Sequence, residues 1–166
     1  MQLKRVVVTG LGAITPIGND VKSFWDGLVQ GKSGAAPITL FDASQFKTQF
    51  ACEVKGFDVE DFISRKAARK MDRFTHFAMV AADEALVNSG IDLDKLDKIR
   101  AGVIWGSGIG GLETFQNECI EFAKGDGTPR FNPFFIPKMI ADIASGQISM
   151  RYGFHGPNYS TVSACA

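Results

Sequence analysis

The sequence has no long run of apolar residues and no excess of charge of one sign. Its 166 residues carry 18 Lys and Arg against 18 Asp and Glu, so the formal net charge at pH 7 is zero. A neutral balance disfavours general nucleic-acid binding, which requires a basic surface. No apolar stretch approaches the roughly 18 residues of a membrane span. The first residues, Met1 to Val6, lack the regions that make up a signal peptide.

Cysteine and histidine are also scarce. The three cysteines, Cys52, Cys119 and Cys165, are odd in number and show no metal-ligand spacing, which disfavours a disulfide scaffold or a zinc site. Free thiols fit a reducing compartment, so we expect a cytoplasmic protein. The two histidines, His76 and His155, have no neighbours that suggest a general base, and we expect packing or surface roles for both.

The overall composition, 45% apolar and 22% charged, is that of an ordinary globular protein. Strand-like and helix-like segments alternate, which predicts an α/β fold with a largely parallel sheet in one domain or part of one. We expect strands at 5–10, 100–105 and 159–162, and a short one near 50–54. We expect helices at 21–30 after the cap Asp20, from Ser64 to Asn88, at 112–124 and at 137–151.

The end of the chain places Cys165 where a strand should give way to a helix. The neighbours Ser163, Ala164 and Ala166 are small, as the tight turn of a nucleophile elbow requires. Such a turn exposes the thiol and directs backbone N–H groups and a helix dipole toward it. A free cysteine among small residues can equally be a buried small hydrophobe, and the residues alone leave both interpretations open. Cys52 and Cys119 lack this context and are interpreted as structural.

The glycine loop 106–111 satisfies the pattern G-x-G-x-x-G between an expected strand and an expected helix. A dinucleotide site also needs an acidic residue about 20 positions on, at the end of a second strand. Asp126 falls instead in an expected loop, and the earlier glycine segment 10–15 lacks the third glycine. The glycines therefore favour a tight turn and a close backbone approach over nucleotide binding.

Basic residues gather around the start of the second expected helix. They are Arg65, Lys66, Arg69, Lys70 and Arg73, with Asp72 as the single acidic residue among them. A solvated helix face is the ordinary explanation of such a cluster. A docking patch for an acidic partner is the alternative, which the neutral balance of the rest of the chain keeps open.

Five motifs in this order resemble the N-terminal portion of the β-ketoacyl-acyl carrier protein synthase family, the elongating condensing enzymes of fatty-acid synthesis. The motifs are 6–12 with 15–19, 64–66 with 69–72, 106–111, 132–135 and 163–166. The isoleucine in the glycine loop and the segment Pro133-Phe134-Phe135 resemble the type II enzyme. The segments 155–160 and 163–166 also resemble type I, which remains an alternative.

The resemblance implies a thiolase-like, layered αβαβα fold built from two similar halves, of which this chain would form most of the N-terminal one, with a mainly parallel sheet. It implies that Cys165 takes an acyl chain from acyl carrier protein as a thioester. Malonyl-acyl carrier protein then loses carbon dioxide, and the resulting carbanion attacks that thioester. No metal or nucleotide cofactor is implied.

The resemblance also assigns roles to other residues. Ile109 would gate the acyl pocket, and Phe135 would reach the pocket of the second subunit in a homodimer. Lys66, Arg69 and Lys70 would hold the acidic carrier protein by charge.

The chain departs from the family pattern in one respect. The two catalytic histidines and the lysine of the family follow the cysteine, and His76 and His155 do not match them. We therefore expect residues 1–166 to be an incomplete, N-terminal part of a synthase domain that is inactive on its own. The alternatives are a condensing domain of a polyketide synthase and a carrier-binding partner subunit of the chain-length-factor type, which would lack the cysteine. A nucleotide-binding module ranks last.

Overall fold

The structure is a computed structural model that describes residues 4–163, and these residues form two compact units. The first unit contains residues up to 58 together with 80–90, and the second contains 59–79 and the residues from 91 onward. Helix α3, Arg73–Ser89, contributes residues to both units. No helix within 4–163 is long and apolar enough to cross a membrane.

Helix α1, Val21–Val29, lies in the first unit and begins as the sequence predicts. The carboxylate of its N-cap, Asp20, accepts the backbone N–H of Ser23 at 2.8 Å. That hydrogen bond stabilises the charged form and holds the pKa of Asp20 below its ordinary value. Gly31 follows the helix with a φ of 65°, a conformation that glycine adopts without strain.

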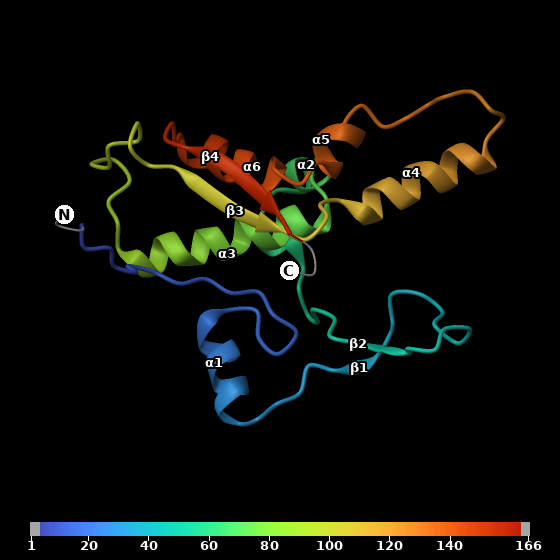
Figure 1. Ribbon diagram of the computed structural model, residues 1–166, viewed down its shortest axis with the longest axis horizontal. Helices are drawn as coiled ribbons and strands as arrows, with labels where there is room; N and C mark the ends of the chain where they lie inside the picture. The colour runs from blue at the N-terminus through green and yellow to red at the C-terminus, as the bar shows by residue number, and fades with distance from the viewer. Residues whose placement is uncertain (1–3, 164–166) are drawn as a thin grey trace. The chain divides into compact units, whose positions relative to one another are not determined.

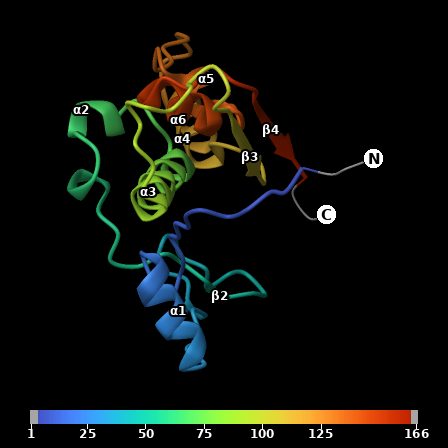
Figure 2. The ribbon, with the colours of Figure 1, turned by 90° about the vertical axis from the view of Figure 1, so that its left-hand side faces the viewer.

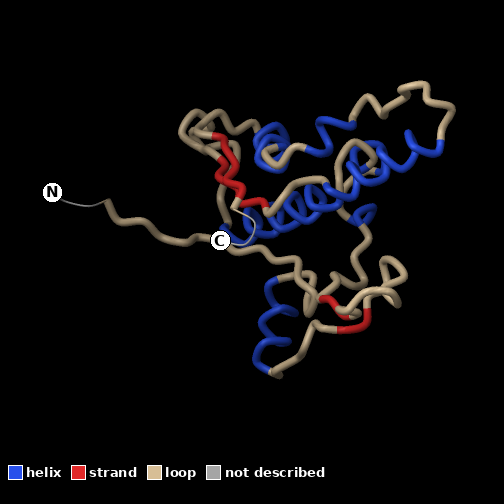
Figure 3. Tube along the Cα trace, turned by 45° about the vertical axis from the view of Figure 1, so that its right-hand side comes forward, coloured by secondary structure: helices blue, strands red, loops and turns tan. Residues whose placement is uncertain are grey.

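The strands of the first unit differ from the expectation. The unit holds a short antiparallel pair, β1 (Ala36–Pro37) with β2 (Phe50–Ala51), of which only the second was expected. The strand predicted at 5–10 is wrong, because this stretch is loop (Figure 3) and leaves Val6 89% exposed. A strand needs a paired neighbour, and no residue within 4–163 pairs with this one.

The segment that follows this loop packs closely on α3 instead. The backbone N–H of Leu11 donates to Asn88, and that of Ala13 donates to the carboxylate of Glu84. A Cβ atom added at Gly12 would lie 1.8 Å from the carbonyl oxygen of Ala81. Glycine is therefore required where this backbone crosses the helix.

The second unit begins with a 3₁₀ turn, η1 (Val59–Asp61), and helix α2 (Arg65–Ala68), for which Ser64 is the N-cap. The single helix predicted from Ser64 to Asn88 is wrong, because the chain turns after α2 and starts again as α3. The carboxylate of Asp72 in this turn is engaged by Thr114, and the carbonyl oxygen of Asp72 accepts the N–H groups of Thr75 and His76. A contact between residues that are far apart in the sequence thus helps to set where α3 begins.

Helix α4, Leu112–Lys124, has the predicted bounds, but the helix predicted at 137–151 is wrong. This region forms two helices, α5 (Phe135–Met139) and α6 (Ile143–Tyr152), separated at Ile140 by extended backbone with a ψ of 139°. The carbonyl oxygen of Met139 accepts the N–H of Gly111 at 2.8 Å. The glycine loop therefore occupies the carbonyl group that a continuous helix would have used.

The sheet of the second unit consists of β3 (Val103–Ser107) and β4 (Asn158–Val162), which are parallel and lie side by side in Figures 1 and 2. Both strands and their parallel direction were expected, but β3 begins at Val103 and not at Arg100. It is also not the fully buried strand that was predicted, since Ile104 is exposed. Helix α6 packs against both strands and buries Ala144 and Ile148. The side chain of Asn158 fastens β4 to α6 through hydrogen bonds with Ser145 and Ser149.

Candidate functional site

The carboxyl ends of β3 and β4 meet at one edge of the sheet, because Ser107 and Val162 are register partners in a parallel pair. The loop after β3 carries Ile109, and the segment after β4 leads to Cys165. Ligand sites of α/β sheets lie at this edge. Cys165 lies outside the described residues, so its predicted position and role are not tested by the structure.

The loop between β3 and α4 lies against the backbone at the end of α5. Gly110 has a φ of 104°, and a Cβ atom there would lie 2.5 Å from the carbonyl oxygen of Met139. A Cβ atom at Gly111 would lie 2.4 Å from the carbonyl oxygen of Lys138. The close backbone approach inferred from the sequence is confirmed at these two glycines.

Ile109 lies in this loop with its side chain 63% exposed. Phe135 is the first residue of α5, and its ring stacks on those of Phe115 and Phe131, with centroid distances of 6.3 and 5.7 Å. The hydrogen bond between Gly111 and Met139 joins the Ile109 loop to the helix that begins at Phe135. Ile109, predicted to gate the acyl pocket, and Phe135, predicted to reach the pocket of the second subunit, thus belong to adjoining segments of this chain.

The three cations predicted to hold a carrier protein are exposed around the end of α2. Lys66 lies within the helix, Arg69 is its C-cap, and Lys70 follows in the turn. The ammonium group of Lys70 lies 5.1 Å from the ring centroid of Phe134, next to α5. The ring quadrupole attracts a cation over the aromatic face. This contact makes the basic turn and the start of α5 neighbours.

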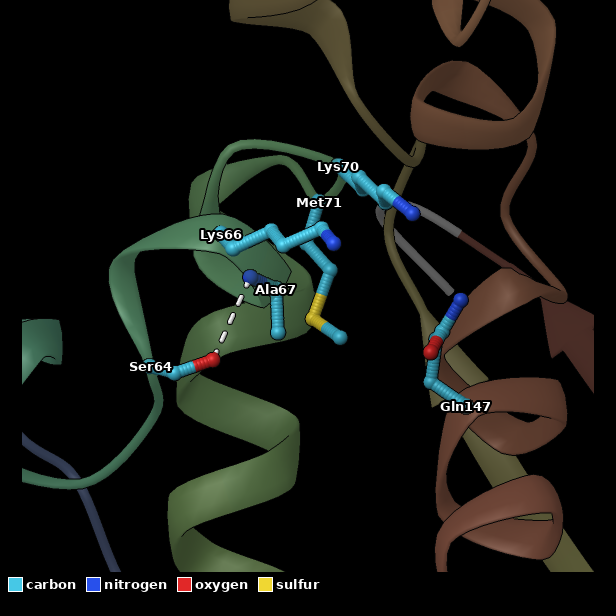
Figure 4. A pocket seen from close by; sticks show the side chains of 6 residues that line it. All are labelled: Ser64, Lys66, Ala67, Lys70, Met71 and Gln147. Carbon is cyan, nitrogen blue, oxygen red and sulfur yellow. Dashed lines mark hydrogen bonds between the residues drawn. The ribbon is translucent and has the colours of Figure 1, made fainter.

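A groove between α2 and α6 lies beside these cations and was not foreseen from the sequence. One part of it has a volume of about 240 Å³ and is lined by Ser64, Lys66, Ala67, Lys70, Met71 and Gln147. Figure 4 shows Lys70 extending toward α6, where Gln147 lies. Ala67, Met71 and Gln147 also line an adjoining cavity of about 430 Å³, whose further lining includes Phe62, Ile63, Met79 and Met150.

The groove is therefore lined both by cations, Lys66, Lys70 and Arg151, and by apolar side chains that include three methionines. Methionine side chains adapt their shape to irregular apolar partners, while the cations attract an acidic one. The sequence signal for this groove is weak: Gln147 and Met150 are three positions apart and so lie on the same face of a helix. Locating the groove required the packing of α6 near α2, which no local pattern predicts.

The two histidines and the cysteines Cys52 and Cys119 were expected to have structural roles. The ring Nε2–H of His76 donates to the carbonyl oxygen of Ala68 at 2.9 Å and so joins α2 to α3. His155 donates its backbone N–H to Lys98. Cys52 and Cys119 are exposed, the second of them within α4. Within residues 4–163, acidic, histidine and cysteine side chains form no group of three that could hold a metal ion.

Comparison with known proteins identifies the relatives of this chain. Residues 3–166 match the family described as "Beta-ketoacyl synthase, N-terminal domain". A "3-oxoacyl-[acyl-carrier-protein] synthase 2" of Synechocystis sp. (strain PCC 6803) is 47% identical over 167 residues, which cover 100% of this chain and 40% of the relative. The chain thus spans about two fifths of the length of the curated relatives that it matches.

Solved structures of ketosynthases share the fold. "The ishigamide ketosynthase/chain length factor" superposes with a TM-score of 0.83 at 29% identity, covering 94% of this chain and 39% of that one. A type II polyketide acyl-carrier protein in complex with its ketosynthase bound to a hexaketide gives a TM-score of 0.76 at 28% identity, covering 96% and 42%. The thiolase-like α/β class predicted from the sequence is confirmed, and the chain belongs to the β-ketoacyl synthase family.

Proposed function

We propose that residues 1–166 form the N-terminal part of a longer synthase domain that extends fatty-acyl chains. The reaction is a decarboxylative Claisen condensation between an acyl thioester on Cys165 and malonyl-acyl carrier protein. The observation that carries the proposal is the register of Ser107 with Val162. Because of this register, the Ile109 loop and the segment that leads to Cys165 both start from the same edge of the sheet. The chain also matches the β-ketoacyl synthase family.

The chemistry follows from a thiolate at that edge. The thiolate sulfur of Cys165 attacks the carbonyl carbon of the acyl-carrier thioester, a new carbon–sulfur bond forms, the bond to the carrier sulfur breaks, and the carrier leaves as a thiolate. The malonyl group then loses carbon dioxide, and the electron pair of the broken carbon–carbon bond forms a carbanion. That carbanion attacks the acyl-enzyme carbonyl, and the Cys165 thiolate is released. The backbone N–H of Cys165 would stabilise the oxyanion in both additions.

The carrier would dock on the basic turn of the second unit. Lys66, Arg69 and Lys70 are exposed there, and the adjacent groove offers apolar surface beside the charges. A related ketosynthase has been solved in complex with its acyl-carrier protein, which supports an acyl carrier protein as the partner. We further propose a cytoplasmic homodimer in which Phe135 contributes to the acyl pocket of the second subunit.

The experiment is a condensation assay on the full-length synthase with acyl- and malonyl-acyl carrier protein. We expect a β-ketoacyl product two carbons longer than the acyl donor, because the malonyl group loses one of its three carbons. Cys165→Ala should abolish this product, whereas Cys119→Ala, as the matched control, should retain it. Full product formation by Cys165→Ala, or none by the unmodified enzyme, would contradict the proposal.

A ketosynthase of polyketide synthesis is the second candidate, because the superposition with the hexaketide-bound ketosynthase covers 96% of this chain. The higher identity of 47% to the fatty-acid type favours the first candidate. Products separate the two possibilities. A polyketide enzyme would extend unreduced β-ketoacyl chains repeatedly, whereas a fatty-acid enzyme would extend saturated chains once per cycle.

A further inference from the structure

Asp72 carries a buried carboxylate that the proposed chemistry does not use. It is 6% exposed, and its partner Thr114 is 7% exposed. The carboxylate oxygen Oδ2 accepts the backbone N–H of Thr114 at 3.0 Å and also the hydroxyl of the same residue, across 42 positions of sequence. A buried carboxylate is costly without such donors, so the two residues hold their segments together.

This contact supplies the cap that helix α4 otherwise lacks. Gly111 is the N-cap of α4 and has no side chain, so no local group caps the helix. Thr114 is the third residue of α4, and its N–H is the group that a capping Asp ordinarily accepts. Asp72 provides that acceptor from the turn between α2 and α3. A Cβ atom at Gly111 would lie 3.0 Å from the same carboxylate oxygen.

The two joined segments are the ones to which the proposed function assigns different tasks. Asp72 follows Arg69 and Lys70, the proposed docking cations, and its carbonyl oxygen starts α3 by accepting the N–H of Thr75 at 3.0 Å. Thr114 stands at the start of α4, directly after the loop that carries Ile109. The position of that loop therefore depends on the turn that meets the carrier.

We propose that Asp72 is a positioning residue that fixes the Ile109 loop through Thr114 and thereby sets the acyl chain length that the enzyme prefers. The proposal rests on the proposed function, together with the expectation that Ile109 gates the acyl pocket. Asp72 itself touches no substrate. Its effect is exerted through the start of α4, so it should appear in chain-length selectivity rather than as a uniform loss of rate.

The test compares Thr114→Val with the unmodified full-length synthase over a series of acyl carriers of increasing length. Valine keeps the volume but removes the hydroxyl donor. We expect the ratio of kcat/KM between the longest and shortest accepted chains to change by about ten-fold, the scale on which pocket contacts discriminate methylene groups. Thr114→Ser keeps both donors and should retain the original ratio, and Thr48→Val is a control outside this contact. An equal loss at every length, or no change, overturns the proposal.

A second measurement does not depend on catalysis. Hydrogen exchange of the backbone amides in 106–114 should be faster in Thr114→Val and in Asp72→Asn than in the unmodified protein, and unchanged in Thr48→Val. Unchanged exchange in both variants overturns the proposal even if the enzyme proves inactive on acyl carriers. Absence of all condensation by the unmodified enzyme, with faster exchange in the variants, would instead contradict the proposed function alone. Asp72→Asn also serves if Thr114→Val does not fold.

Discussion

Ser107 at the end of β3 lies opposite Val162 at the end of β4 in a parallel register. A parallel pair places both carboxyl ends on one edge, so the two segments that follow leave the sheet together. One of these segments carries Ile109, and the other leads to Cys165 three positions later. This pairing brings together Ser107 and Val162, which are more than fifty positions apart in the sequence.

Replacing Ile109 by alanine should weaken the discrimination between acyl chains of different length. The side chain is exposed on the loop at the sheet edge, and its removal enlarges the space that we assign to the acyl chain. A pocket contact of this kind is worth about 1–3 kcal/mol between substrates. Competition between two acyl carriers, read by mass spectrometry of the acyl-enzyme, measures the change. An unaltered preference in Ile109→Ala, matching that of the control Ile99→Ala, would refute the role of Ile109.

Reversing the charge of a proposed docking cation should raise the KM for the carrier with little effect on kcat. For Lys66→Glu, Arg69→Glu or Lys70→Glu we expect an increase of about three- to ten-fold at low salt, since exposed charges act mainly on association. The difference should diminish as salt screens the charges. Lys32→Glu, an exposed cation of the other unit, is the matched control. Equal KM values for all four variants would show that the carrier docks elsewhere.

Replacing Gly110 by alanine should destabilise the protein, whereas Gly108→Ala should have little effect. Gly110 combines a φ of 104° with a Cβ position 2.5 Å from the carbonyl oxygen of Met139, while a Cβ at Gly108 meets no atom within 4 Å. We expect a loss of about 1–3 kcal/mol for the first variant, from backbone strain and steric overlap. Urea unfolding of both variants measures it. Similar stability of the two would mean that the loop does not need its close approach to α5.

Asp20 should make the stability of the protein depend on acid. Its pKa is lowered in the folded state, chiefly by the backbone hydrogen bond from Ser23, from an ordinary value of 3.8. A lowered pKa means that the stabilisation is present above the ordinary value and is lost as the pH falls through the folded value. Near neutral pH, Asp20→Ala should cost about 1 kcal/mol, as for the loss of a helix cap.

The acid dependence distinguishes the cap from a general effect of charge. The stability gap between the unmodified protein and Asp20→Ala should narrow below about pH 4. Asp20→Asn, which retains an oxygen acceptor, should remain near the unmodified protein at neutral pH and show less acid dependence. Thermal unfolding at several pH values measures both gaps. A gap for Asp20→Ala that is constant with pH would contradict the assigned cap.

Local patterns predicted the bounds of two helices. Asp20 and Gly31 delimit α1, and the bounds of α4 at Leu112 and Lys124 match the expectation. Both helix breaks escaped prediction because long-range contacts cause them. At the break between α2 and α3, the carboxylate of Asp72 accepts the N–H of Thr114. At the break between α5 and α6, the carbonyl oxygen of Met139 accepts the N–H of Gly111.

Strand pairing and the groove also lay beyond local pattern. The apolar residues Val6 to Val8 have a β-prone sequence, yet a strand forms only where a neighbour supplies hydrogen bonds. The groove near Lys66 depends on how α6 packs beside α2. For the candidate site, the sequence proposed Ile109, Phe135 and the basic cluster, whose roles stay predictions. That their segments adjoin became visible only through the Gly111–Met139 bond and the contact of Lys70 with Phe134.

The most direct test of the central claim is to map the acyl-enzyme bond. The full-length synthase is incubated with acyl-acyl carrier protein without malonyl donor, quenched with acid, digested and examined by mass spectrometry. We predict the acyl mass on the peptide that contains Cys165, and its absence from the peptides with Cys52 and Cys119. An unmodified Cys165 peptide, or equal acylation of all three cysteines, would contradict the account.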